Sequence, residues 1–188
     1  MRRRDVLAGV GSVGVLVGAG LVATRGVPSF DDDGNGDGAT VDAGADPITV
    51  ETLEAPGSSA GEVTIPAGDR VTFVDFFGTW CPPCVEQMPA LGAAHERVGD
   101  SVQFVSVTTE PVGDAVPEST VVEWWDEHDG NWLLGIDPTA ELAARYLAGG
   151  FPSAAAIDAA GRVQWSDAGV KTAAELVAGI GRALEADE

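Results

Sequence analysis

Two cysteines separated by two prolines are the residues of this 188-residue chain whose types and spacing best support chemistry. Such a pair can close a small disulfide, and its dithiol and disulfide forms interconvert by exchange with the thiols of a partner protein. Cys81 stands where a strand-like run gives way to helical spacing, and the N–H groups at a helix start stabilise a thiolate. Cys84 lies one turn further on and suits a resolving role. Because Pro82 and Pro83 lack N–H groups, the amide of Cys84 is the nearest donor left for the Cys81 sulfur.

The elements that must position these cysteines alternate between strands and helices. An almost continuous apolar run over 71–77 predicts a strand covered on both faces, and helical spacing over 85–98 predicts the helix that follows it. The other predicted elements are a β-hairpin over 48–65, a strand over 102–108, a helix over 119–128, a short strand over 132–136, a helix with Asp137 as N-cap and Pro138 in its first turn that ends at Gly149, a hairpin over 153–165 and a final helix with a capping box of Thr172 and Glu175. This order predicts an α/β fold with a mixed central sheet flanked by helices, an N-terminal β-hairpin and an extra helical insertion.

Asp75 is a carboxylate within the apolar run, six residues before Cys81. A buried carboxylate is costly to ionise, so we expect a raised pKa and a group that can exchange a proton. The alternative is a strand-edge aspartate that faces solvent. We favour burial, because the neighbours of Asp75 on both sides are apolar.

Around the cysteines and at a second motif further along the chain, the sequence resembles the thioredoxin superfamily. It resembles more closely the exported, tethered branch of that superfamily, the TlpA/ResA-type thiol-disulfide oxidoreductases. The match rests on FFGTWCPPC over 76–84, on Met88-Pro89 in the following helix and on GGFPS over 149–153. It covers roughly residues 48–187. The resemblance implies a thioredoxin-like fold and a protein thiol-disulfide oxidoreductase, with disulfide reduction as the favoured direction. Such chemistry would run on the two cysteines without a bound cofactor.

The resemblance also implies a role for each reacting group. Cys81 is the nucleophile that attacks a substrate disulfide, and Cys84 resolves the mixed disulfide. Asp75 occupies the position of the buried acid that assists deprotonation of the resolving cysteine.

Three further residues are expected to contact the substrate. In the family, the proline at the position of Pro152 follows a cis peptide bond and faces the active cysteine. The backbone of its neighbour, Phe151, would pair with the incoming peptide. Trp80 lies beside Cys81, so we expect it to face the substrate rather than the core.

The sequence departs from the family pattern at two places. Gln87 stands three residues after the second cysteine, where the family often has glutamate. No lysine or arginine occurs between Arg97 and Arg145, so the lysine that often accompanies the buried acid in thioredoxins has no evident counterpart. We therefore expect proton handling to rest on Asp75 alone.

The N-terminus has the plan of an export signal: three arginines, an uncharged glycine-rich run over 6–23, and then Arg25. The stretch Arg3-Arg4-Asp5-Val6-Leu7 resembles the twin-arginine export motif. No Ala-x-Ala site follows the run, so a retained membrane anchor is favoured over cleavage. We expect an extracytoplasmic protein, tethered to the cell membrane or secreted after cleavage. The predicted division is an export signal or anchor over 1–25, an acidic flexible linker over 26–47 and a thioredoxin-like domain over 48–188.

Charge excludes one large class of function. Thirty acidic residues against ten basic ones give a formal net charge of −20, which repels nucleic acid phosphates. The 45% of hydrophobic residues indicates a chain that folds. Lys171 is the single lysine, and an acidic, lysine-poor composition is similar to that of proteins from salt-accumulating halophiles, where concentrated salt screens self-repulsion.

Metal binding is the main alternative to redox exchange. A zinc centre would need His95 and His128 beside the two cysteines, and the proline spacer disfavours it. A copper(I)-binding or metallochaperone module on the same fold would use the two thiolates, with Met88 as the nearby thioether. A redox-inert fold with a structural disulfide is a third possibility.

The expected partners follow from the redox hypothesis. They are protein thiols and disulfides as substrates, a membrane thiol-disulfide protein as electron donor, and the membrane itself through the N-terminal segment. Related proteins of the TlpA/ResA branch often act in cytochrome c maturation, which the resemblance suggests here. Oxidase and isomerase directions remain open at this point.

Overall fold

The computed structural model describes residues 46–146 and 149–188, so the predicted export segment and the linker up to residue 45 lie outside the described part of the chain. The elements are β1 (Ile48–Thr52), β2 (Gly61–Ile65), β3 (Thr72–Phe77), α1 (Pro82–Val98), the short 3-10 helix η1 (Gly99–Ser101), β4 (Gln103–Thr108), α2 (Glu118–Glu127), β5 (Leu133–Ile136), α3 (Glu141–Tyr146), β6 (Ser153–Ile157), β7 (Val163–Ala168) and α4 (Ala173–Ala186). The alternation of strands and helices predicted from the sequence is confirmed.

Within the described residues, seven strands form one sheet in the order β2-β1-β5-β4-β3-β6-β7. β3 runs parallel to β4 on one side and antiparallel to β6 on the other. β4 and β5 are also parallel, whereas the pairs β1–β2, β1–β5 and β6–β7 are antiparallel. The sheet is therefore mixed, as predicted, and the strand that leads into the cysteines has a neighbour on each side.

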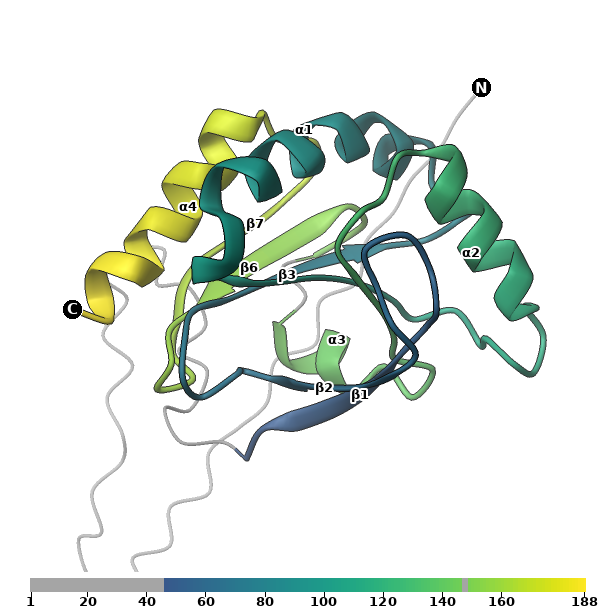
Figure 1. Cartoon of the computed structure of the whole chain (residues 1–188), viewed down its shortest axis with the longest axis horizontal. Helices are drawn as coiled ribbons and strands as arrows, with labels where there is room; N and C mark the ends of the chain where they lie inside the picture. Colours follow the sequence, from purple (N-terminus) through teal and green to yellow (C-terminus); the bar gives the residue numbers. More distant parts are fainter. Residues whose placement is uncertain (1–45, 147–148) are drawn as a thin grey trace, which may run out of the picture. The chain divides into compact units, whose positions relative to one another are not determined.

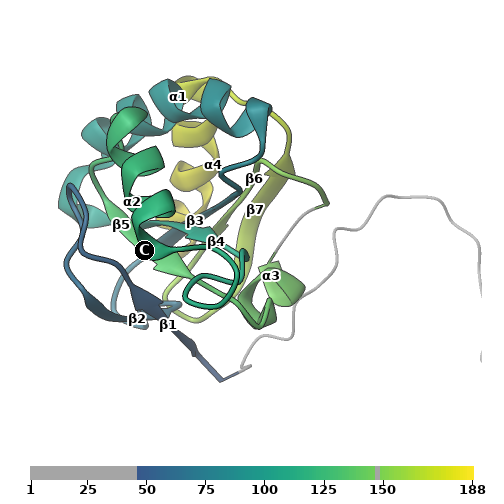
Figure 2. The same ribbon diagram turned by 90° about the vertical axis from the view of Figure 1, so that its right-hand side faces the viewer.

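Helices cover both faces of this sheet. α1 and α4 lie side by side over one face (Figure 1). α2 packs into the same apolar cluster as these two helices. α3 packs on the opposite face in a second cluster, and Figure 2 shows it separated from α1 and α4 by the strands. In the part of the chain that the structure describes, no helix has the length and apolar character needed to cross a membrane.

All six residues of β3 are buried, which explains its nearly continuous apolar sequence. Side chains alternate between the two faces of a strand. Phe73 and Phe77 accordingly pack in the cluster under α1 and α4, and Val74 and Phe76 pack in the cluster under α3. Asp75 shares a face with Phe73 and Phe77, so the alternation directs its carboxylate toward α1 and α4, the side on which the cysteines lie.

The start of α3 differs from the prediction. Asp137 and Pro138 were expected to be its N-cap and first turn, but the helix begins at Glu141. Ala140 adopts a φ of 56°, which turns the chain before the helix starts. The buried Asp137 still caps the helix, because its carboxylate accepts the N–H groups of Glu141 at 3.0 Å and Ala143 at 2.9 Å. Local sequence showed the cap but not the turn between cap and helix.

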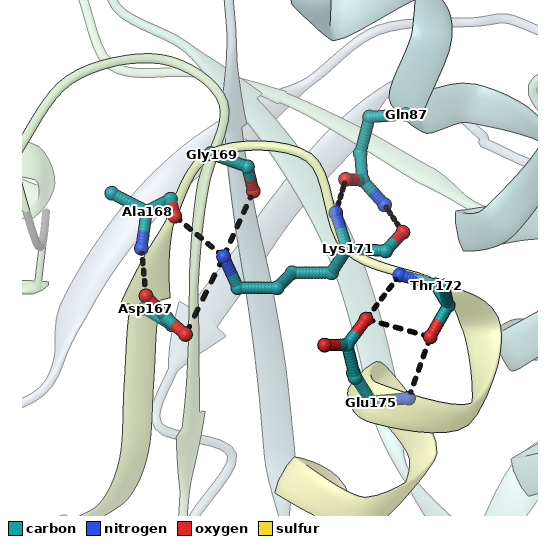
Figure 3. A network of polar contacts seen from close by, with 7 residues as sticks. All are labelled: Gln87, Asp167, Ala168, Gly169, Lys171, Thr172 and Glu175. Carbon is teal, nitrogen blue, oxygen red and sulfur yellow. Dashed lines mark hydrogen bonds and ion pairs between the residues drawn. The ribbon is translucent and has the colours of Figure 1, made fainter.

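The predicted capping box of α4 is confirmed. The hydroxyl of Thr172 accepts the N–H of Glu175 at 3.3 Å, and Glu175 Oε2 accepts the N–H of Thr172 at 2.8 Å (Figure 3). The box fixes the point at which the chain leaves β7 and enters α4. That junction contributes to the site described next.

Candidate active site

Cys81 and Cys84 form a disulfide at the start of α1, with their Cα atoms 5.3 Å apart. Both residues are buried. Cys81 is the N-cap residue with an extended backbone, and Pro82 and Pro83 are the first helical residues. The amide of Cys84 donates to the Cys81 carbonyl at 3.0 Å. In this disulfide form, the donor expected to support the Cys81 sulfur is therefore engaged by the backbone.

The loop before the cysteines is held by a glutamate that sequence reasoning did not single out. Glu110 is buried, and its carboxylate accepts the N–H of Thr79 at 2.7 Å and the Thr79 hydroxyl at 2.8 Å. It also accepts the hydroxyl of Thr108 at 3.1 Å. These bonds anchor the backbone two residues before Cys81.

Strand pairing explains how Glu110 reaches the loop. β3 and β4 are parallel with Phe77 opposite Thr108, and Thr79 and Glu110 each lie two residues beyond this pair. The carboxyl ends of parallel strands meet at one edge of a sheet, where functional groups often gather. A polar residue just after a second buried strand was the signal that could have located Glu110.

Trp80 forms an exposed aromatic surface beside the disulfide. It is 65% exposed, whereas the other tryptophans of the described residues are covered to a much greater extent. The Phe151 ring meets it edge-on, with centroids 5.7 Å apart. An added Cβ at Gly78 would lie 2.9 Å from the Trp80 indole, so a larger residue there would force the indole to shift. The peptide bond between Phe151 and Pro152 is cis, as the resemblance implied.

Asp75 is 1% exposed, which excludes the alternative of a solvent-facing carboxylate. Burial raises the pKa of Asp75 to about 7, against the opposing effect of a hydrogen bond from Ser106. The Ser106 hydroxyl lies 3.0 Å from Asp75 Oδ2. Asp75 also lines a small cavity of about 10 Å³ together with Gln87 and Pro152. Such a space is no larger than a single water molecule.

Gln87 projects from α1 into the loop between β7 and α4 (Figure 3). Its side-chain oxygen accepts the N–H of Lys171 at 2.6 Å, and its amide nitrogen donates to the Lys171 carbonyl at 3.1 Å. The position where the family often has glutamate is therefore occupied by an amide that satisfies one backbone donor and one backbone acceptor. This pairing ties the helix that carries the cysteines to the C-terminal part of the fold.

The single lysine lies closer to the site than its sequence position suggested. Lys171 lines the same small cavity as Asp75, although its ammonium group donates to the carbonyls of Ala168 at 2.5 Å and Gly169 at 3.4 Å. It also pairs with Asp167 at 3.4 Å. The stretch between Arg97 and Arg145 contains no basic residue, and Lys171 reaches the cavity from the loop after β7.

Two tryptophans of α2 and the two histidines of the zinc alternative have packing positions. Trp124 and Trp125 are buried and lie against Phe77, with ring centroids 4.8 Å and 6.1 Å apart. His95 lies against other aromatic rings, and His128 is the C-cap residue of α2. Over residues 46–146 and 149–188 there is no group of three or more histidine, cysteine, aspartate and glutamate side chains that could hold a metal ion.

Comparison with known proteins places this chain in a family. The Redoxin family matches residues 27–180, and the chain belongs to it. The crystal structure of StoA from Bacillus subtilis superposes with a TM-score of 0.60 at 22% identity, over 73% of this chain and 98% of that one. The predicted thioredoxin-like fold is thereby confirmed.

Curated proteins with similar sequences include a chloroplast thioredoxin and a bacterial thiol-disulfide oxidoreductase. Thioredoxin Y, chloroplastic, from Oryza sativa subsp. japonica is 40% identical over 42 residues, or 22% of this chain and 25% of that protein. Thiol-disulfide oxidoreductase ResA from Bacillus cereus is 25% identical over 105 residues, or 55% of this chain and 58% of that protein. The chain thus spans from a quarter to under three fifths of the length of these relatives, and the predicted likeness to ResA-type proteins is confirmed.

Proposed function

We propose that this protein is an exported, membrane-tethered thiol-disulfide oxidoreductase that reduces disulfides in other proteins through Cys81 and Cys84. The observation that carries the proposal is the disulfide at the start of α1, beside an exposed tryptophan. A disulfide that only stabilised the fold would not need an aromatic surface open to a partner. The sequence similarity to ResA supports the same chemistry.

The first step is attack by the Cys81 thiolate on a substrate disulfide. The new bond joins the Cys81 sulfur to one substrate sulfur, and the second substrate sulfur leaves as a thiolate. The N-terminal end of α1 stabilises the attacking thiolate electrostatically. Trp80 and Phe151 provide apolar contact area for the substrate, and the backbone beside Pro152 pairs with its extended peptide.

The second step closes the enzyme disulfide. Cys84 gives its proton to the Asp75 carboxylate and attacks the Cys81 sulfur, so the bond between Cys81 and the substrate breaks and the substrate leaves as a thiolate. Two electrons have then passed from the dithiol to the substrate. A pKa of about 7 suits Asp75 to this transfer, because the group can accept and release a proton near neutral pH.

Return to the dithiol requires an electron donor outside the cytoplasm. We assign this role to a thiol-disulfide protein of the membrane, with the segment over 1–25 as export signal or anchor and the acidic linker over 26–47 giving reach. Support comes from the arginines and the apolar run of the N-terminus. Apocytochromes before haem attachment are the substrate class that the TlpA/ResA resemblance suggests.

The test uses the full chain with a disulfide-bonded model protein as substrate, in concentrated salt because the formal net charge is −20. We expect Cys81→Ser to abolish reduction and Cys84→Ser to accumulate a mixed disulfide that includes Cys81. A Cys81→Ser protein as active as the wild type would refute the proposal. Near-stoichiometric copper(I) binding without thiol exchange would support the binding module instead.

A further inference from the structure

Two hydrogen bonds connect Asp75 to a tryptophan in the core. Ser106 stands directly opposite Asp75 in the parallel pairing of β3 and β4, and its hydroxyl lies 3.0 Å from Asp75 Oδ2. The indole Nε1 of Trp132 lies 2.9 Å from Ser106 Oγ. Ser106 is fully buried and Trp132 is 3% exposed. We call these three residues the Asp75 relay.

The indole fixes the direction of the first bond, and the ionised carboxylate fixes the direction of the second. An indole N–H can only donate, so Ser106 Oγ is the acceptor from Trp132. In the described part of the chain, the hydroxyl hydrogen of Ser106 is donated to Asp75 Oδ2. Donation into Ser106 also polarises its O–H group and strengthens the second bond. The relay therefore supplies Asp75 with a hydrogen bond that favours its carboxylate form.

The other groups around Asp75 do not replace this donor. From α1 the cavity receives the neutral amide of Gln87, and from β7 and the loop after it come Asp167 and Lys171. The last two pair with each other at 3.4 Å, so their charges largely compensate. From β6 come Ser153 and Ala154. Desolvation raises the pKa of Asp75, and the hydrogen bond from Ser106 is the contact that lowers it.

We propose that Ser106 and Trp132 are positioning residues for the thiol-disulfide reaction: the Trp132 indole holds the Ser106 hydroxyl as a donor to Asp75, and this keeps the carboxylate able to take the proton of Cys84. The proposal rests on the proposed function for its chemical step. The relay itself exists without it. Ser106 and Trp132 touch neither the substrate nor the sulfur atoms in this role and act through Asp75.

The first measurement follows the titration of Asp75 itself, in the disulfide form and in concentrated salt, by carboxyl ¹³C NMR. The Asp75→Asn variant assigns the resonance. Loss of a hydrogen bond to a charged group should raise the Asp75 pKa by about one unit in Ser106→Ala, a tenfold change in proton affinity. Trp132→Phe should shift it in the same direction by less, because the hydroxyl remains but is no longer oriented.

Trp125 provides a matched control. It is also a buried tryptophan, and its indole donates at 3.0 Å to the carbonyl of Pro56, outside the relay. The Trp125 ring also meets the Trp132 ring, with centroids 4.9 Å apart. Trp125→Phe keeps an aromatic ring at this contact and removes a hydrogen bond outside the relay, so it should leave the Asp75 titration unchanged. Ser106→Thr keeps the hydroxyl and should restore a titration close to that of the wild type. His95 lies against Trp132, with ring centroids 5.7 Å apart, and His95→Gln identifies any contribution from histidine charge.

The second measurement follows the resolving step. The reduced protein is converted to a mixed disulfide of Cys81 with 5-thio-2-nitrobenzoate, and release of the coloured thiol by Cys84 is recorded against pH. In Ser106→Ala the rising limb should move to higher pH by the same amount as the Asp75 titration. Unchanged Asp75 titrations in folded Ser106→Ala and Trp132→Phe would overturn the proposal, as would shifted titrations with an unchanged release profile. If the Asp75 titration shifts in both variants but the wild-type protein exchanges no thiols, the relay is supported and the proposed function is refuted.

Discussion

Glu110 holds Thr79 by both its backbone N–H and its hydroxyl, two residues before the first cysteine. Replacing Glu110 with alanine leaves buried donors without an acceptor, and we expect a loss of about 2 kcal/mol or more in the free energy of unfolding. Glu110→Gln retains one carbonyl oxygen and should lose about 1 kcal/mol. Denaturant unfolding in concentrated salt measures both. The exposed Glu118→Gln is the control, and equal stability of all four proteins would contradict this prediction.

Asp75 makes stability depend on pH in a direction opposite to that of most carboxylates. Its pKa rises from 3.8 to about 7 on burial, so between these values the folded protein binds a proton that the unfolded chain has released. Stability therefore falls as the pH rises through this window. At about pH 8, Asp75→Asn should be more stable than the wild type by up to about 4 kcal/mol, and the difference should vanish below about pH 4.

The measurement is denaturant unfolding of the disulfide form across this pH range. Asp126→Asn makes the same chemical change at an exposed position and should show no such trend. If Asp75→Asn lost stability at alkaline pH, the buried carboxylate would have to be stabilised by contacts other than those described.

Gln87 is matched to one donor and one acceptor of the Lys171 backbone, so its replacement by glutamate should be costly. In Gln87→Glu a carboxylate oxygen faces the Lys171 carbonyl, and we expect a loss of about 2 kcal/mol at neutral pH. Protonation restores a donor, so the loss should shrink as the pH falls. Unfolding at two pH values measures this effect. Glu86→Gln on the exposed side of α1 is the control, and a pH-independent loss would point to packing alone.

Trp80 is exposed enough to be removed without loss of the core. We expect Trp80→Ala to change the free energy of unfolding by less than about 1 kcal/mol. Reduction of a protein disulfide should slow about tenfold, because exposed tryptophans often dominate binding at interfaces. A small disulfide that needs no docking surface should react at the wild-type rate. Val170→Ala, the other exposed large apolar side chain of the described residues, should behave like the wild type in both assays.

The sequence was sufficient where a signal is local. The apolar run of β3, the helix that starts at the cysteines and the capping box of α4 are patterns within a few neighbouring residues. The burial of Asp75 followed from its neighbours in the same strand. Each of these predictions needed only the alternation of side chains or the preferences of helix ends.

The sequence was insufficient where the site depends on pairing across the sheet. Ser106 meets Asp75, and Glu110 meets Thr79, because β3 and β4 are parallel in one register, and a shift by one residue would separate both pairs. Gln87 and Lys171 are 84 residues apart. The start of α3 was missed for another reason, since Asp137 caps the helix across a turn that local propensity does not indicate.

The bond between Gln87 and Lys171 also bears on how the protein is made. During synthesis, α1 and both cysteines emerge well before the loop that satisfies the Gln87 amide. Until that loop is in place, the helix that carries the cysteines cannot bury its polar side chain without an unpaired amide. A ribosome-bound chain that ends before α4 should therefore expose its cysteines to oxidants and reductants in a way that the finished protein does not.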